Sequence, residues 1–287
     1  MCHYENGENY IALSVGLLTA FWNEVEDFVS QDNLTSVFKI SEENRPTFMD
    51  NIYFYMLNFT IAHEYGHIAH GHLREQNGEK SIDETFGMSD VANDKDRKAK
   101  NWTTQLKEYD ADSFAVTIQA VLFLQQWQED IRVNLANFDK MFIANYLCFR
   151  TFAEKTGRKF ADYFDKSIDE YDHPHPGIRM YYSYIHYSYW IGRFRDFGED
   201  TMTILGSGSD AVISYEKNVL GKEKIKECYY SVAFTEKGAQ HVMNLHNGWQ
   251  EKIEHFNEYA YMEIEKMDTI DSMPVSLDKN GNFVNKN

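Results

Sequence analysis

The stretch 47–74 constrains this chain more than any other, because it is long, rich in Phe, Tyr, Leu and Ile, and free of proline. Pro46 precedes it, at a position where a helix can begin. We therefore predict one long buried helix over these residues. Near its end, this helix carries the sequence His63-Glu64-Tyr65-Gly66-His67.

The spacing of His63 and His67 predicts a metal site. Residues four apart on an α-helix differ by about 40° around its axis, so both imidazoles point to the same side. Two such nitrogens can bind one zinc ion. Glu64 lies on the adjoining edge, where its carboxylate can take a proton from a zinc-activated water and pass it to a leaving amine. The alternative is a buried helix whose histidines are only hydrogen-bonded.

A catalytic zinc site needs a third protein ligand. The extended metzincin pattern places a histidine ten residues after His63, but Leu73 stands there, and His70 stands where that pattern has glycine. The metzincin pattern is therefore excluded. His70 lies one helical turn beyond His67, and we expect it to support the site from behind or to face solvent.

A second helix, predicted over residues 102–128, offers a better third ligand. Glu108 and Asp112 share one face of it, and the small Ala111 would let it approach the histidine helix closely. Glu108 can be the third ligand, and Asp112 can accept the free ring N–H of a zinc-bound histidine. The alternative is an ordinary acidic helix face, because the chain has 45 Asp and Glu residues.

Composition excludes several other classes of protein. The formal net charge of −17 would repel a nucleic-acid backbone, so we expect no nucleic-acid partner. The longest apolar stretch near the N-terminus, 11–22, is too short and too interrupted to span a bilayer, and no secretory signal precedes it. The three scattered cysteines indicate reduced thiols in the cytoplasm, and they are Cys2, Cys148 and Cys228.

Periodicity predicts a mainly α-helical fold. Further helices are expected over residues 8–30, 138–155, 178–197 and 236–267, and a polar surface loop over 75–101. The piece LGSGS lacks the residues of a phosphate loop and is interpreted as a turn. The end of the chain is predicted to be a small β element, a hairpin around Asn280-Gly281, or else a frayed tail. We divide the chain into a zincin-like domain, 1–200, and a C-terminal extension packed on it, 201–287.

Three motifs together resemble a known group of enzymes. A HExxH helix followed by a Glu-x-x-Ala-Asp helix, and then by His173-Pro174 with Arg179 six residues after that histidine, is similar to the gluzincin peptidases related to the prenyl-protein (CAAX) endopeptidases. Because membrane helices are not expected here, the chain more closely resembles the soluble Lit family of phage-exclusion peptidases. The resemblance covers roughly residues 10–182, including His72.

The resemblance implies a set of roles and a function. His63, His67 and Glu108 would be zinc ligands, Glu64 the general base, and Asp112 the partner of a ligand. His173 or Arg179 would stabilise the oxyanion of the scissile carbonyl, and His175 is an alternative because the His-Pro pattern is doubled. His72 is expected to cap or pack the helix end.

We therefore expect a zinc-dependent endopeptidase that cleaves a protein or peptide substrate during phage exclusion or another bacterial stress response. A metalloprotein regulator of a mobile element and a non-catalytic zinc-binding scaffold are the alternatives. The sequence makes no prediction of the oligomeric state.

Overall fold

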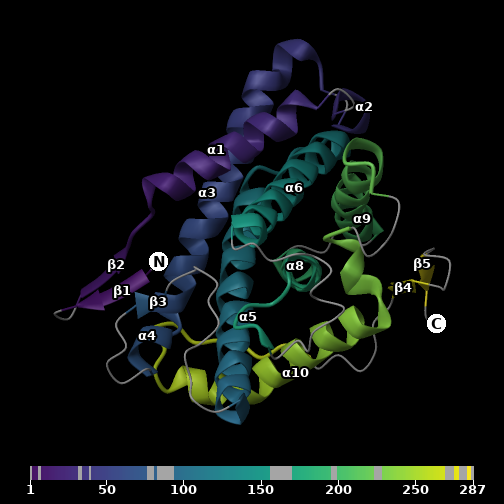
Figure 1. The fold of residues 1–287 in the computed structure, drawn as a ribbon. Helices are drawn as coiled ribbons and strands as arrows, with labels where there is room; N and C mark the ends of the chain where they lie inside the picture. Colours follow the sequence, from purple (N-terminus) through teal and green to yellow (C-terminus); the bar gives the residue numbers. More distant parts are fainter. Residues whose placement is uncertain are drawn as a thin grey trace.

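The computed structural model of the protein describes residues 2–5, 8–31, 34–38, 40–75, 81–82, 94–155, 170–194, 199–222, 228–268, 275–277 and 283–285. It is mainly helical, as predicted (Figure 1). The α-helices are α1 (Val15–Ser30), α2 (Leu34–Phe38), α3 (Arg45–Ala69), α4 (His72–Glu75), α5 (Asp94–Gln125), α6 (Ile131–Lys155), α8 (Pro176–Phe194), α9 (Glu199–Ser214) and α10 (Glu236–Asn257). Shorter turns are the 3-10 segments η1 (Glu42–Asn44) and η5 (Ser231–Phe234), and the π-helical turn η3 (Tyr215–Val219).

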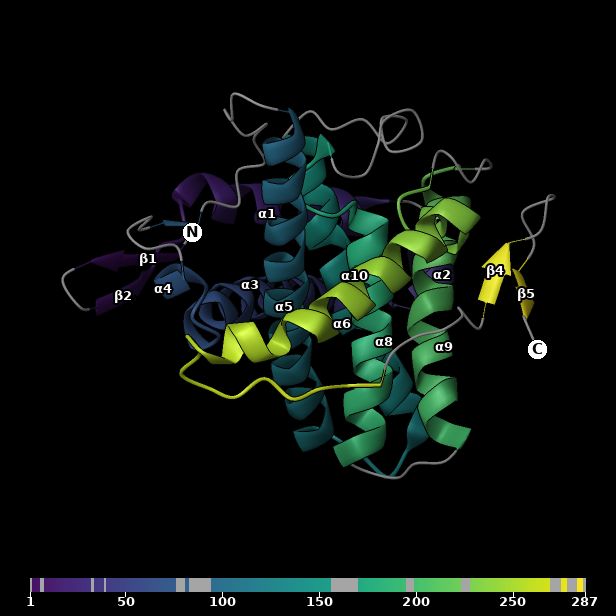
Figure 2. The same ribbon diagram turned by 90° about the horizontal axis from the view of Figure 1, so that it is seen from below.

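The strands are short and lie at the margins of the helical body (Figure 1). β1 (Cys2–Glu5) pairs antiparallel with β2 (Glu8–Ile11) and with β3 (Ser81–Ile82). β4 (Val275–Leu277) pairs antiparallel with β5 (Phe283–Asn285), so the predicted C-terminal hairpin is confirmed, although its turn at Asn280-Gly281 falls outside the described residues. The two sheets lie on opposite sides of the molecule in both views (Figures 1 and 2).

The core is built around α3, which packs against α5 and α6. One cluster of buried apolar side chains runs from Phe21 in α1 to Ile264 beyond α10. α10 crosses α5 and α8 on one face of this body (Figure 2). Within the described ranges, no helix combines the length and the apolarity needed to cross a bilayer.

The close approach of α3 and α5 follows from two small residues. A Cβ added to Gly66 would lie 3.1 Å from the Cα of Ala111 and 3.0 Å from the Cβ of Phe114. The backbones can meet at this point only because Gly66 has no side chain. The predicted packing of the HExxH helix on the Glu-x-x-Ala-Asp helix is confirmed, and Ala111 lies at the contact as expected.

The predicted single helix over 47–74 is wrong at its end. α3 begins at Arg45 and ends at Ala69. It is followed by Gly71 with a φ of 73°, a value that residues other than glycine rarely adopt. The backbone N–H groups of Tyr261 and Met262, in the segment after α10, both bond to the carbonyl oxygen of Ala69, at 2.7 and 3.1 Å. A segment distant in the sequence therefore supplies hydrogen bonds to the last turn of α3. The helix ends there, although local periodicity predicts that it continues.

Three other predicted boundaries are corrected. Residues 8–11 form β2 rather than a helix, because they pair antiparallel with the neighbouring strand β1. The polar segment 94–101, predicted as loop, is the start of α5, where Arg97 and Lys98 pair with Glu170 at 2.6 and 3.3 Å. α10 ends at Asn257 rather than near residue 267.

The turn predicted at LGSGS is also wrong, since these residues lie inside α9. A Cβ on Gly208 would lie 2.7 Å from the ring of Phe138 in α6. Glycine is unfavourable in a helix by about 1 kcal/mol, but here it lets α9 lie directly on an aromatic ring. Tertiary packing therefore outweighs local propensity.

Candidate metal centre

Three buried side chains from α3 and α5 converge on one point. The Nε2 atoms of His63 and His67 lie 3.1 Å apart, and each lies 3.4 Å from a different carboxylate oxygen of Glu108. All three side chains are almost completely buried. The spacing of four residues on α3 and the Gly66–Ala111 contact together produce this geometry. We call His63, His67 and Glu108 the inner cluster, and it could hold a metal ion.

The carboxylate of Glu108 is buried with ion-pair contacts but without a hydrogen bond from the described residues to either oxygen. Burial alone would raise its pKa, but the charge of His173 and the contacts with His63 and His67 hold the pKa of Glu108 well below its usual range. A buried carboxylate that stays ionised without hydrogen bonds is normally paired or coordinates a metal. The donor set therefore fits a divalent cation.

Asp112 fixes one of the two histidines from behind. Its Oδ1 lies 2.8 Å from the Nδ1 of His63, and a carboxylate can only accept, so His63 donates from Nδ1 and turns its Nε2 lone pair to the inner cluster. Arg179 donates to both oxygens of Asp112, at 2.7 and 2.8 Å, and the hydroxyl of Tyr182 donates to Oδ2. Burial opposes ionisation, but the Arg179 charge lowers the pKa of Asp112 below its usual value.

Arg179 is held tightly in this arrangement. Besides its two bonds to Asp112, its guanidinium lies 4.5 Å from the ring centroid of Phe149 and 3.7 Å from Glu108. The sequence resemblance implied a role at an oxyanion for His173 or Arg179. The contacts of Arg179 favour the positioning of Asp112 instead.

His173 lies at the edge of the inner cluster. Its Nε2 is 3.6 Å from Glu108, and its Nδ1 is 3.0 Å from the carboxylate of Asp172. His175 has a different position, because its Nδ1 accepts the backbone N–H of Gly177 at the start of α8 and its ring stacks on Tyr229. Of the two histidines in the doubled His-Pro pattern, His173 therefore lies beside the inner cluster, and His175 caps a helix.

Glu64 lies on α3 directly after His63 and is fully buried. On an α-helix it is rotated by about 100° from His63 and by about 60° from His67. Helix geometry therefore places Glu64 on the edge of α3 next to His63 and His67.

A second group of polar side chains lies behind the inner cluster. The Nδ1 of His70 lies 2.6 Å from Oδ2 of Asp110, the Nε2 of His72 lies 3.0 Å from the same oxygen, and the indole N–H of Trp249 donates to Oδ1 at 2.7 Å. We call His70, His72, Asp110 and Trp249 the outer cluster. Burial lowers the pKa of His72 to about 4, and that of Asp110 is also low, since burial is outweighed by His70 and His72.

The two clusters are in direct contact. The Nδ1 of His67 lies 2.8 Å from the Nδ1 of His72. The sequence predicted only a capping or packing role for His72 and did not single out Asp110 or Trp249. Local spacing gives no sign of this contact, because it depends on the break at Gly71 and on the docking of α10.

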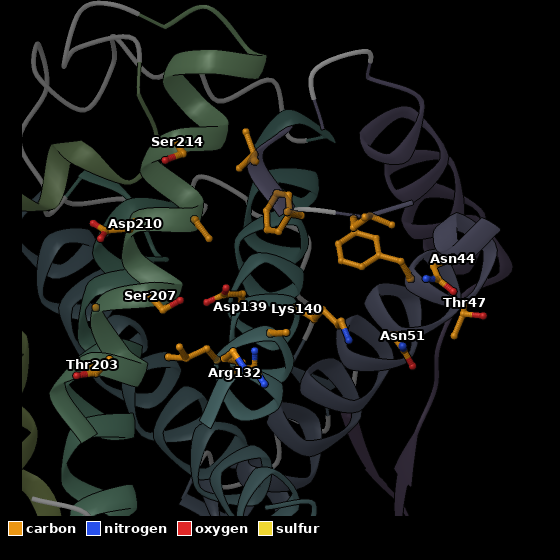
Figure 3. Close-up of a pocket in the computed structure, with 18 of the residues that line it drawn as sticks. Asn44, Thr47, Asn51, Arg132, Asp139, Lys140, Thr203, Ser207, Asp210 and Ser214 are labelled. Carbon is orange, nitrogen blue, oxygen red and sulfur yellow. The ribbon is translucent and has the colours of Figure 1, made fainter. Parts of the chain in front are cut away.

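A large cavity lies elsewhere, at the other end of α3 (Figure 3). It has a volume of about 1080 Å³ and lies between α3, α6 and α9, with Asp139 and Lys140 on α6 and Ser207 on α9. Burial raises the pKa of Asp139 to about 6. Asn51, on its wall, precedes His63 by more than three helical turns, which is about 18 Å along the axis. The cavity is therefore separate from the candidate metal centre.

Comparison of the chain with protein-family models, with curated proteins and with solved structures gives no match.

Proposed function

We propose that this protein is a zinc-dependent endopeptidase whose metal ligands are His63, His67 and Glu108. The observation that carries the proposal is the convergence of their ligand atoms: the two Nε2 atoms lie 3.1 Å apart, and each lies 3.4 Å from a different carboxylate oxygen of Glu108. Zinc makes bonds of about 2.0–2.2 Å to nitrogen and oxygen, and a tetrahedral arrangement then separates two ligand atoms by about 3.3–3.5 Å. Three protein ligands leave a fourth position open, as catalytic zinc sites require.

The chemistry divides among the neighbouring residues. When bound, zinc would polarise a peptide carbonyl and lower the pKa of a water molecule. Glu64 accepts the proton of the attacking water and returns it to the leaving amine. His173, oriented by Asp172, donates to the developing oxyanion. Asp112 holds His63 in the tautomer that leaves Nε2 for the metal, and Arg179 holds Asp112.

The biological setting of the proposal is drawn from the three sequence motifs alone. Their resemblance to the Lit family supports cleavage of a host protein in the cytoplasm during phage exclusion or a related stress response. The acidic charge of the chain argues against a nucleic acid as its substrate.

The test compares wild type with Glu64→Gln, which keeps the size of the side chain and removes the base. We expect both proteins to contain equal zinc after purification and only wild type to release new N-termini from a cell lysate. Loss of a general base should lower the rate of cleavage by about 10²–10⁴-fold.

The matched control is Glu43→Gln, a substitution at an exposed glutamate in η1, which should cleave as wild type does. Equal zinc content with no cleavage by any of the three proteins would contradict the peptidase and leave a zinc-binding scaffold. Loss of zinc from Glu64→Gln would contradict the assignment of this residue as base.

A further inference from the structure

The contact between His67 and His72 is unexpected from their positions in the sequence. Residues five apart on a continuous α-helix are rotated by about 140°, so their side chains point to different faces. Here their Nδ1 atoms lie 2.8 Å apart, because α3 ends at Ala69 and the left-handed Gly71 turns the chain back before α4 begins with His72. The turn places a second imidazole directly behind a metal ligand.

The direction of the hydrogen bonds in this chain of residues follows from Asp110. Its carboxylate can only accept, and the Nε2 of His72 lies 3.0 Å from Oδ2 in an ion-pair contact rather than an aligned hydrogen bond. The proton of the neutral ring is therefore most favourable on Nε2. The Nδ1 of His72 is then an acceptor, and the Nδ1 of His67 must donate to it. His67 is thereby left with its lone pair on Nε2, the atom that faces His63 and Glu108.

Asp110 is in turn fixed from two sides. His70 holds Oδ2, and Trp249 donates its indole N–H to Oδ1. Trp249 belongs to α10, in the C-terminal extension. The ring of His72 also packs against Phe256 of α10, with ring centroids 5.3 Å apart.

We propose that His72 and Asp110, secured by Trp249 of α10, are positioning residues that fix the metal-binding tautomer and orientation of His67. The inference rests on the metal site of the proposed function and deepens it. The two ligating histidines are thus supported differently. His63 bonds directly to the carboxylate of Asp112, whereas His67 reaches the carboxylate of Asp110 through a second imidazole. The C-terminal extension is part of the metal centre through this connection.

The experiment measures the Zn²⁺ affinity of the purified full chain by competition with a chromophoric chelator, together with the visible absorption spectrum of the Co²⁺-loaded protein. Outer partners of metal ligands typically contribute about 10–100-fold in affinity, so His72→Phe should weaken Zn²⁺ binding by about that factor and change the Co²⁺ spectrum. His72→Asn, whose amide oxygen can replace Nδ1 as acceptor, should recover part of the loss. Trp249→Phe, which removes only the N–H, should weaken binding by roughly 3–10-fold.

The controls are residues of the same kinds, the buried His241 and the half-buried Trp102. His241 bonds to Gln105 at 3.0 Å, and Trp102 packs on Gly248 of α10, so His241→Gln and Trp102→Phe should stay within about twofold of wild type. A folded His72→Phe protein with Zn²⁺ affinity and Co²⁺ spectrum like those of the controls would overturn the proposal. If His72→Phe does not fold, His72→Asn and Trp249→Phe decide, and control-like values for both overturn it.

Hydrolysis plays no part in these measurements. A protein that binds Zn²⁺ tightly but cleaves nothing would contradict the proposed peptidase, while the affinity series would still decide the role of His72. Conversely, a working peptidase whose Zn²⁺ affinity ignores His72 and Trp249 would contradict only the inference made here.

Discussion

The inner and outer clusters both combine two histidines with one carboxylate of α5, yet their carboxylates are in opposite situations. In the outer cluster, Asp110 is contacted by two imidazoles and bonded by an indole N–H. In the inner cluster, Glu108 has only contacts of 3.4 Å or more and no hydrogen bond from the described residues. The two clusters are therefore similar in composition, but the carboxylate of the inner cluster lacks hydrogen bonds and that of the outer cluster does not.

This difference favours the inner cluster over the outer cluster as the group that could hold a cation. A buried carboxylate with its hydrogen bonds satisfied contributes to the stability of the fold by itself. The carboxylate of Glu108 has ion-pair contacts with His173 and Arg179 at 3.6 and 3.7 Å but no hydrogen bond, so it can still accept a cation beside the two imidazole lone pairs. Residue type alone does not separate a metal site from a structural network. The number of hydrogen bonds that the carboxylate already accepts does separate the two.

The largest effect should come from removing the carboxylate of the outer cluster. Asp110→Ala would leave two imidazoles and an indole N–H without their common acceptor, and breaking a buried pair in this way costs about 3–5 kcal/mol. Glu108→Ala should change the free energy of unfolding of the metal-free protein by much less. Urea denaturation in the presence of a chelator measures both, and equal losses would break the comparison.

The reverse ranking is expected for metal affinity. Glu108→Gln removes a ligand, so Zn²⁺ binding should weaken by more than the ~100-fold upper limit for outer partners, or about 3 kcal/mol. Asp110→Asn keeps every ligand and should fall within that limit. Chelator competition on the folded proteins measures both values. A smaller loss for Glu108→Gln than for Asp110→Asn would show that the ligand has been assigned to the wrong cluster.

The third effect is a loss of folding stability at acidic pH. We attribute it to the histidine next to the outer cluster. His186 packs on Trp249, and burial, reinforced by His246, lowers the pKa of His186 to about 3. The unfolded chain takes up a proton near pH 6.5, whereas the folded protein resists it, so stability is present above pH 6.5 and is lost as the pH falls toward 3. Between pH 7 and pH 5 this single group should cost about 2 kcal/mol.

The variant His186→Gln cannot take up that proton. Its free energy of unfolding, measured in metal-free protein, should therefore fall less steeply than that of wild type between pH 7 and pH 5. Between pH 7 and pH 8 the two proteins should differ by a constant amount. An identical slope in the acid range would contradict the assignment of a neutral buried imidazole.

The smallest loss of stability should come from removing one hydrogen bond to Asp112, the residue that supports the inner cluster. Tyr182→Phe removes one hydroxyl donor from Asp112, which keeps Arg179 and His63 as partners. A hydrogen bond to a charged group contributes about 1.5 kcal/mol at the low end of its range, and we expect a loss of that size. Thermal and urea denaturation measure it. A loss as large as that of Asp110→Ala would mean that Asp112 depends on this single hydroxyl.

Much of the inner cluster could be predicted from the sequence, because its geometry is set by local rules. The spacing of His63 and His67 and that of Glu108 and Asp112 each define one face of a helix, and Ala111 allows the two faces to meet. Predicting that these residues lie together requires only that the two helices are predicted correctly. The structure brings all of them together.

The outer cluster could not be predicted in the same way. His72 reaches His67 only through the left-handed conformation of Gly71, which local periodicity does not reveal. Trp249 is linked to Asp110 by the docking of a distant helix. The helix α9 was missed for a related reason, since Gly208 is unfavourable locally and is required by the ring of Phe138. In each case a tertiary contact overrides the local preference.

The docking of α10 has a consequence for when the proposed metal site can form during synthesis. A ribosome adds about 5–20 residues per second, so roughly 10–40 s separate the synthesis of His67 from that of Trp249. The segment that bonds to the end of α3, at Tyr261 and Met262, emerges later still. During that interval the nascent chain carries His63 and His67 without their full support. Tight metal capture is therefore expected only after translation is nearly complete, which would keep an unfinished chain from becoming an active hydrolase.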